Sequence, residues 1–339
     1  MTNSLTLVTP TFEPLGICLD PFAASANLSC DPNAFAVMDG PTLSFRSLKP
    51  ISKDEEIFIS YIDNTNPIAR RQHELKERWF FTCACAKCQK GPTGLSDDWK
   101  KAPSAMPKKW QECADDLMKN NPSISTEPAS HIGPSLAARR LAAIQAWAFN
   151  HLDEAQSLAK EDEPDDAIAV LEDGIRVCYQ SEMWPLARQP YPALRHELFV
   201  NMLSVGSFAL AWSQAAKTYF LIDPLLYPER HHPLRVVHCW ALTKLTLYLA
   251  GKQDSFVVMD MQRVGLNLGV VVYGLLMEVV ENVVGSHGRE SRFAREVKRK
   301  VEEVMVDMTR QVPGVIGRAR ASMEEQWKVF RRAADWLQM

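Results

Sequence analysis

The stretch Trp79–Gln89, with the sequence WFFTCACAKCQ, places Cys83, Cys85 and Cys88 within six residues. Structural zinc takes four ligands tetrahedrally, and a C-x-C-x-x-C run can supply three thiolates from one short loop. A fourth ligand must then come from elsewhere. Among the other five cysteines Cys30 stands out, because it lies in the turn-rich sequence NLSCDPN, whereas the other four have apolar or helical surroundings. We therefore predict a zinc site, with a redox or disulfide role for the thiols as the alternative.

The composition is that of a globular chain. Its 339 residues are 46% apolar and 23% charged, which is enough for two domains that each bury a core. The formal net charge of −3 argues against a globally basic nucleic-acid binder. A local basic group is interpreted as a solvated helix face, with contact to an acidic partner as the alternative. This group consists of Arg70, Arg71, Lys76 and Arg78.

The amino-terminal sequence has no basic start and no long apolar segment, so it does not predict a secretory signal. We therefore expect reduced thiols in the cytoplasm or the nucleus, where clustered cysteines are more often metal ligands. The apolar run Val270–Met277 falls short of the ~20 residues that a membrane span requires. It indicates a buried helix, and we expect no membrane partner.

Residues 34–61 alternate between apolar and polar side chains, which predicts a small β module. The expected strands are Ala34–Met38, Leu43–Arg46 and Glu56–Tyr61. Asp39-Gly40 indicates a hairpin, and Pro41 suggests a loop longer than two residues. A helical pattern over Asn66–Phe80 then leads to the cysteine run. The Gly-, Pro- and Lys-rich segment after Gln89 is the expected domain boundary.

From Ser135 onward the pattern predicts an almost entirely helical region. The expected helices are Ser135–Ala159, Asp165–Gln180, Pro192–Ser204, Ser207–Ile222, Pro233–Leu249, Phe256–Val284, Ser291–Thr309 and Ala319–Leu337. Small alanines within Asp166–Leu171 and Phe208–Trp212 are typical of tetratricopeptide-like helix pairs, and an irregular helical bundle is the alternative. His231 and His232 are interpreted as part of a helix start rather than as a pair of metal ligands.

The first ninety residues resemble the SET-domain lysine methyltransferases, specifically the SET-and-MYND branch with its post-SET cysteines. The resemblance rests on five elements in order: N-x-S-C-x-P-N, a short β meander, E-E-I-F-I-S-Y, a basic helix and C-x-C-x-x-C. Glu55–Tyr61 matches the strand that ends in the active-site tyrosine of the family. The residues that match the family signature NHSCxPN are Asn27, Ser29, Cys30, Pro32 and Asn33, with Leu28 in place of the histidine.

The resemblance implies an α+β fold in three parts. Residues 1–92 would form a small β-rich partial SET domain with a zinc-bound post-SET segment, and residues 93–134 a linker with a short helix. Residues 135–339 would form an all-α tetratricopeptide-like domain, similar to the carboxyl-terminal domain of that branch. Neither the Gly-x-Gly strand nor the MYND finger of the family precedes Asn3. We therefore expect the chain to hold the carboxyl-terminal half of the catalytic fold.

The resemblance also implies an activity, the transfer of a methyl group from S-adenosylmethionine to a lysine of a histone or non-histone protein. Tyr61 would be the catalytic residue that orients the amine. The cofactor contacts would be Asn27, Leu28, Trp79, Phe81 and, on a weaker match, Asn3. The zinc ligands would be Cys30, Cys83, Cys85 and Cys88.

Simpler interpretations of these residues stay open. Trp79 and Phe81 can be core residues, and Tyr61 can be the amphipathic end of a strand. At the level of the whole chain, the alternative is a non-catalytic, zinc-stapled scaffold that binds a protein partner through its helices.

Overall fold

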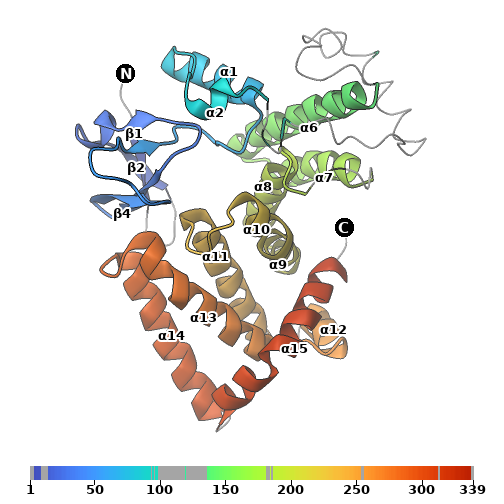
Figure 1. The fold of residues 1–339 in the computed structure, drawn as a ribbon. Coiled ribbons are helices and arrows are strands. Elements are labelled where there is room, and N and C mark those ends of the chain that lie inside the picture. Colours follow the sequence, from blue (N-terminus) through green and yellow to red (C-terminus); the bar gives the residue numbers. More distant parts are fainter. Residues whose placement is uncertain are drawn as a thin grey trace. The chain divides into compact units, whose positions relative to one another are not determined.

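The computed structural model describes residues 4–8, 14–92, 94, 96–97, 119, 136–180, 184, 186–252, 256–311 and 314–336. They fall into two compact units (Figure 1). Unit 1 consists of Met1–Asn64, Gln72–Gln89 and Tyr227–Trp336, and unit 2 chiefly of Thr65–Arg71 and Lys90–Leu226. Unit 1 therefore joins the predicted β module and the cysteine run to the last helices of the chain.

The β part of unit 1 is built from three two-stranded sheets within the described residues. Strands β1 (Ser4–Val8) and β2 (Pro14–Leu19) pair antiparallel, as do β4 (Ala34–Asp39) and β5 (Thr42–Ser47). The short strands β3 (Asn27–Leu28) and β6 (Phe58–Ile59) pair in parallel. A short 3₁₀ helix, Ala23–Ser25, precedes β3. The last expected strand, Glu56–Tyr61, is thus much shorter than its sequence pattern predicts.

The turn between β4 and β5 is tighter than the sequence predicts. Asp39 pairs with Thr42, which leaves Gly40 and Pro41 as a two-residue loop, so the expectation of a longer loop is wrong. Gly40 has a φ of +61°, and a proline φ is fixed near about −65°, which together fit a type II′ turn. Pro41 occupies the position whose N–H is not needed for strand pairing.

The helices of unit 1 include α11 (Pro233–Ala250), α12 (Phe256–Arg263), α13 (Leu268–His287), α14 (Arg292–Gln311) and α15 (Val315–Trp336). The sequence pattern predicts one helix over Phe256–Val284, and the structure has two. Gly265 adopts a left-handed φ of +84°, and Asn267 caps α13 by accepting a hydrogen bond from the Val270 N–H at 3.2 Å. Gly265 therefore favours the end of one helix and Asn267 the start of the next, and these two local effects outweigh the continuous apolar pattern.

Within the described residues, α13 is the one helix long and apolar enough to cross a membrane by length and composition. A window of 18 residues in it is 56% buried in the structure. Val271, Leu275 and Leu276 are fully buried. The core helix of a folded domain has the same properties, as the sequence predicts for this run.

The β4–β5 hairpin contacts the turn between α13 and α14, also within unit 1. The Arg46 Nη2 donates to the carbonyl oxygens of Val284 at 3.2 Å and Gly285 at 3.1 Å, at the end of α13. Asp39 Oδ2 accepts a hydrogen bond from the Arg292 N–H at 2.7 Å, at the start of α14. Each charge is favourable at its helix end, because a cation lies near carbonyl groups and an anion near free N–H groups.

Unit 2 is a series of helices in which each described helix packs against the next. They are α6 (Leu136–Lys160), α7 (Pro164–Gln180), α8 (Tyr191–Ser204), α9 (Phe208–Lys217), a π turn at Thr218–Ile222 and α10 (Asp223–Leu226). Ala167 and Ala211 are fully buried, as expected for close helix pairs. The predicted linker, residues 93–134, lies almost wholly outside the described residues.

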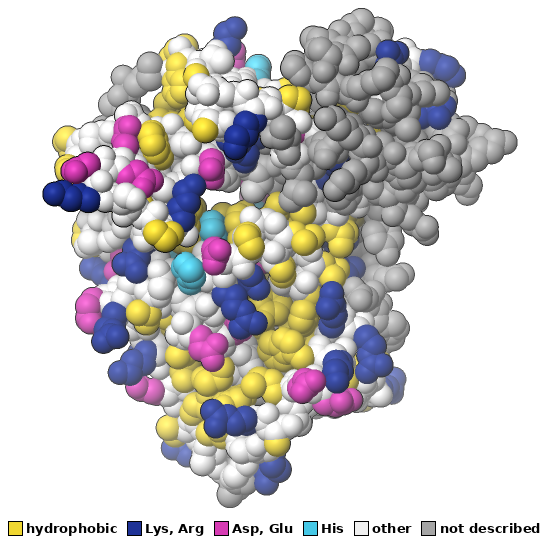
Figure 2. All heavy atoms as spheres, viewed as in Figure 1, with side chains coloured by type: hydrophobic (Ala, Val, Ile, Leu, Met, Phe, Trp, Pro, Cys, Tyr) yellow, Lys and Arg dark blue, Asp and Glu magenta, His cyan; other side chains and the backbone are white. Residues whose placement is uncertain are grey.

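The basic helix does not present all of its charges to solvent. Helix α1 (Ile68–Trp79) buries Arg71, which is 2% exposed, donates to the Asn66 carbonyl oxygen and lies 4.0 Å from Asp97 Oδ2. Arg70 pairs with Asp153 at 2.6 Å. The interpretation of the whole group as a solvated face is therefore wrong for Arg71. Figure 2 shows basic and acidic side chains interspersed over the described atoms of one face, which agrees with the small net charge.

Candidate metal centre and pocket

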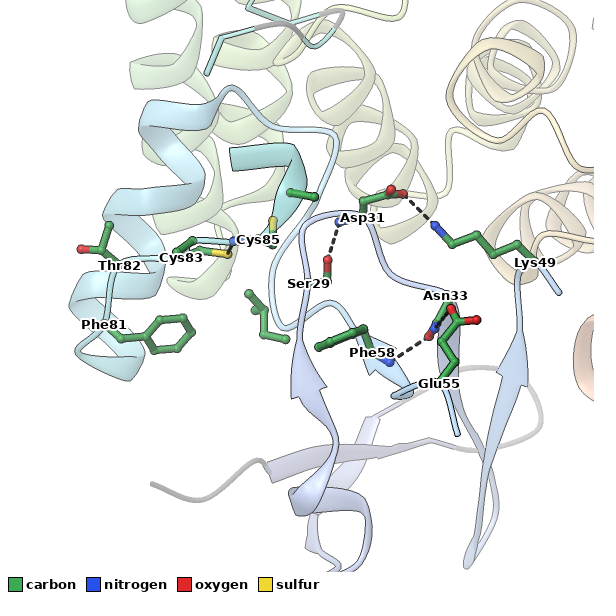
Figure 3. Close-up of a pocket in the computed structure, with 13 residues that line it drawn as sticks. Ser29, Asp31, Asn33, Lys49, Glu55, Phe58, Phe81, Thr82, Cys83 and Cys85 are labelled. Atoms are coloured by element: carbon green, nitrogen blue, oxygen red, sulfur yellow. Dashed lines mark hydrogen bonds and ion pairs between the residues drawn. The ribbon is translucent and has the colours of Figure 1, made fainter. Parts of the chain in front are cut away.

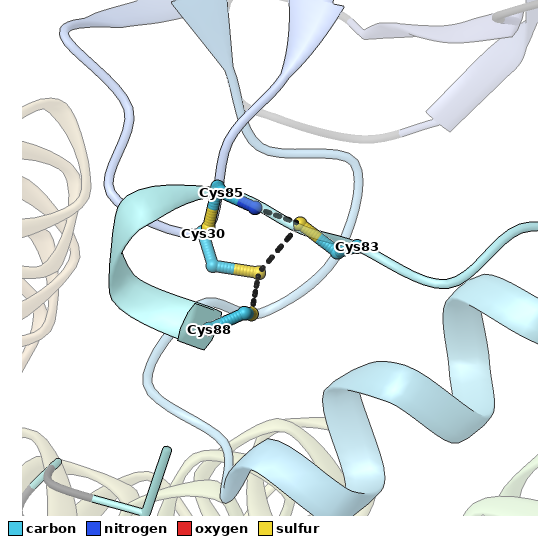
Figure 4. Close-up of side chains that lie close together, drawn as sticks. All are labelled: Cys30, Cys83, Cys85 and Cys88. Carbon is cyan, nitrogen blue, oxygen red and sulfur yellow. Dashed lines mark hydrogen bonds between the residues drawn. The ribbon is translucent and has the colours of Figure 1, made fainter. Parts of the chain in front are cut away.

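The four predicted zinc ligands lie together in unit 1 (Figure 4). The sulfur atoms of Cys30, Cys83, Cys85 and Cys88 are all within 4.8 Å of one another. Cys30 Sγ lies 4.0 Å from Cys83 Sγ and 3.6 Å from Cys88 Sγ. Tetrahedral zinc with Zn–S bonds of about 2.3 Å requires S···S separations of about 3.8 Å, whereas a disulfide requires about 2.0 Å. The observed separations therefore fit four thiols around a metal ion rather than a disulfide.

Burial and local hydrogen bonds shift the pKa values of the Cys83 and Cys85 thiols in opposite directions. Burial raises the pKa of Cys83 to about 11. Burial also opposes ionisation of Cys85, but the backbone N–H groups of Cys88 and Cys30 outweigh it and lower the pKa of Cys85 to about 6. Thiolate is the form that binds metal, and a bound dication deprotonates its thiol ligands. The chemistry of these donors therefore matches a thiophilic ion such as zinc.

A pocket of about 390 Å³ adjoins the cysteines (Figure 3). Leu28 and Phe81, two of the predicted cofactor contacts, line it, together with Phe58 on the apolar side. Cys83 and Cys85 belong both to the pocket wall and to the metal cluster. The remaining lining residues are Ser29, Asp31, Asn33, Lys49, Glu55, Thr82, Ala84 and Ala86.

The polar side chains that line the pocket were not among the predicted site residues, apart from the cysteines. Asn33 donates from Nδ2 to Glu56 O at 2.8 Å and Glu55 Oε1 at 3.2 Å, and its Oδ1 accepts from the Phe58 N–H at 2.8 Å. The Ser52 N–H lowers the pKa of Glu55, with Asn33 adding to the effect, so this carboxylate is ionised at neutral pH. Lys49 pairs with Asp31 at 3.3 Å. Asn33 and Glu55 lie in the two sequence elements that carry the resemblance, but no local pattern indicates Lys49.

The other predicted site residues lie apart from this pocket wall. The Tyr61 hydroxyl donates to the Ala26 carbonyl oxygen at 2.6 Å, and its ring centroid lies 5.7 Å from that of Trp79. Asn27 is exposed and donates to Glu56 Oε1 at 2.5 Å. None of these three residues lines the pocket. Asn3 lies outside the described residues.

Comparison with known proteins agrees with this arrangement. The model of the SET domain matches residues 14–62. We refer to these matched residues as the SET segment. The SET segment therefore includes strands β2 to β6, Leu28, Cys30 and Tyr61, and it ends before the cysteine run.

Several curated relatives are SET-and-MYND proteins, and this chain is similar to them over part of its length. "SET domain and MYND-type zinc finger protein 6" of Schizosaccharomyces pombe is 41% identical over 99 residues, which is 29% of this chain and 20% of the relative. "Histone-lysine N-methyltransferase SMYD3" of Homo sapiens is 31% identical over 112 residues, 31% of this chain and 26% of the relative. "N-lysine methyltransferase SMYD2-A" of Danio rerio is 37% identical over 86 residues, which is 25% of this chain and 20% of the relative. The match thus spans about a fifth to a quarter of these relatives. Over these segments the chain is similar to SET-and-MYND proteins.

Proposed function

We propose that the SET segment and the cysteine run form the site of a protein-lysine N-methyltransferase that uses S-adenosylmethionine. One observation carries the proposal: the pocket lined by Leu28 and Phe81 shares Cys83 and Cys85 with the metal cluster. A ligand in this pocket would therefore contact a wall held in place by the metal. The relatives named as lysine methyltransferases support the same reaction and a protein substrate.

Zinc is the ion that we assign to the cluster, with Cys30, Cys83, Cys85 and Cys88 as its ligands. It would close a loop of about fifty residues between Cys30 and the cysteine run, and such a closure restricts the unfolded chain. The structural consequence is that Phe81, two residues before Cys83, is tied to the SET segment. Because free thiols suit a reducing compartment, we place the protein in the cytoplasm or the nucleus.

S-adenosylmethionine supplies an electrophilic methyl group on a positively charged sulfonium. The protein must then align a neutral lysine amine with that group and exclude water. Phe58 and Phe81 supply an apolar wall, and the Glu55 carboxylate favours a positively charged ligand. Tyr61 lies outside the lining of this pocket, so it would act on the lysine amine rather than on the cofactor; its hydroxyl, which donates to the Ala26 carbonyl oxygen, would orient the amine through a hydrogen bond.

Calorimetry and a transfer assay test the proposal. The chain should bind S-adenosylmethionine, and Phe81→Ala should weaken that binding. Tyr61→Phe should lower methyl transfer to protein substrates by about 100-fold while the cofactor still binds. Binding of protein partners without cofactor binding or transfer would instead favour a scaffold. Elemental analysis that finds no zinc in the purified protein would refute the metal assignment separately.

A further inference from the structure

Helix α1 and the segment after it run side by side in opposite directions within Gln72–Cys83. The helix ends where the Phe80 N–H donates to the Lys76 carbonyl oxygen at 3.1 Å and Phe80 takes a left-handed φ of +60°. Gln72 lies about 10.5 Å before Trp79 along the helix, a distance that the three residues after Phe80 are long enough to cover. The reversal at Phe80 therefore returns Cys83 to the level of Gln72.

At this level the Gln72 carboxamide makes two hydrogen bonds to one residue. Its Nε2 donates to the Cys83 carbonyl oxygen at 2.8 Å, and its Oε1 accepts from the Cys83 N–H at 2.8 Å. A carboxamide carries a donor and an acceptor side by side, as a peptide group does. The side chain of Gln72 thus holds the backbone of Cys83 as a neighbouring strand would.

Fixing this backbone fixes the sulfur atom of Cys83. That sulfur accepts a hydrogen bond from the Cys85 N–H at 3.5 Å and lies 4.0 Å from Cys30 Sγ. Hydrogen bonds from residues that touch the ligands but not the ion orient the ligands of metal sites, and their loss typically lowers metal affinity by about 10- to 100-fold. Phe81, in the pocket wall, is two residues from the same anchor.

We propose that Gln72 is a positioning residue for the metal centre, acting through the backbone of Cys83. This inference rests on the metal site proposed above. Gln72 itself contributes no ligand atom to the cluster. Its role is to set one ligand before the ion arrives, so that less order has to be gained on binding.

The matched pair Gln72→Glu and Gln89→Glu tests this role. Both changes turn an amide into a carboxylate of the same shape beside the cluster, and so both add one negative charge. Gln72→Glu removes the donor to the Cys83 carbonyl oxygen. Gln89→Glu removes a single exposed hydrogen bond, from Nε2 to the Ala84 carbonyl oxygen at 2.8 Å.

Zinc affinity is measured for the full-length chain by competition with a chromophoric chelator. We expect Gln72→Glu to lower the affinity at least tenfold and Gln89→Glu to change it less than threefold. Leu75→Ala, a core change in the same helix, should lower the melting temperature without a tenfold loss of affinity. Equal affinities for the two glutamate variants, or an equal loss for Leu75→Ala, would refute the positioning role.

Amide hydrogen exchange on the unaltered protein gives a second measurement that does not depend on how a variant folds. The Cys83 N–H should exchange much more slowly than amides of exposed loops, because Gln72 accepts from it. Free exchange at Cys83 would overturn the inference even if zinc binds. Failure of the unaltered chain to bind zinc would instead refute the metal site, and with it the role that depends on that site.

Discussion

Replacement of Arg46 with methionine should separate the β hairpin from the end of α13. Arg46 donates to two carbonyl oxygens in the last turn of that helix, Val284 O and Gly285 O. Hydrogen bonds from charged donors contribute about 1.5–3 kcal/mol each when buried, and this contact is exposed, so we take about 0.7 kcal/mol for each. The interaction of a cation with a helix carboxyl end adds about 0.5 kcal/mol. The expected loss in the free energy of unfolding is therefore about 2 kcal/mol.

Urea denaturation at pH 7.5 measures this loss, and methionine retains most of the apolar stem of arginine. Arg295→Met, a change of the same kind at an exposed arginine of α14, is the control and should alter the free energy of unfolding by less than about 0.5 kcal/mol. The effect at Arg46 should also shrink in 1 M NaCl, because salt screens the helix-end interaction. A loss no larger than that of the control would show that the hairpin does not stabilise α13 in this way.

Three further outcomes follow from the structure. Burial lowers the pKa of His287 from 6.5 to about 4, so the stability that it contributes is complete above pH 6.5 and is lost as the pH falls toward 4. Burial lowers the pKa of His232 in the same way, so urea titrations of the unaltered chain between pH 7.5 and 5 contain both contributions. His287→Gln should make the loss of stability over this range about 2 kcal/mol smaller, and an unchanged loss in the variant would contradict this. Gly40→Ala and Gly91→Ala should each destabilise the chain by about 1 kcal/mol, because both glycines have a positive φ. A Cβ at Gly40 would lie 2.7 Å from Arg292 Nη1, but this atom ends a flexible, exposed side chain that can move aside, so widely different melting temperatures of the two variants would contradict this reasoning. Removal of metal with a chelator should lower the melting temperature reversibly, with zinc restoring it, and Cys85→Ser should not respond to added zinc.

The cysteine cluster could be predicted because most of its information is local. Three of its four cysteines lie within six residues, and Cys30 lies in a turn-rich signature that differs from the settings of the other cysteines. Leu28 and Phe81 line the adjoining pocket, and their role as cofactor contacts stays a prediction. Asn27 shows the limit of that reasoning, because in the structure its amide bonds to Glu56 rather than facing the pocket.

Other features could not be predicted, because the partner is distant or has no side-chain signature. Arg46 and Gly285 are 239 residues apart, and no periodicity in either segment indicates that they meet. Gln72 bonds to the backbone of Cys83, and every residue has such backbone groups. The sequence around Gln72 therefore gives no sign of this contact. The break before α13 is different: Gly265 and Asn267 were visible signals, but the apolar run around them suggested continuity.

The spacing of the cysteines also has a consequence for biosynthesis. Cys30 is separated from Cys83 by 53 residues, and translation at about 5–20 residues per second leaves an interval of about 3–10 s between them. During this time the Cys30 thiol is outside the ribosome without its partners, whereas the three later cysteines emerge almost together. If the site takes up the proposed zinc, capture by all four ligands can therefore be complete only after the whole loop has been made, and Cys30 must stay reduced until then.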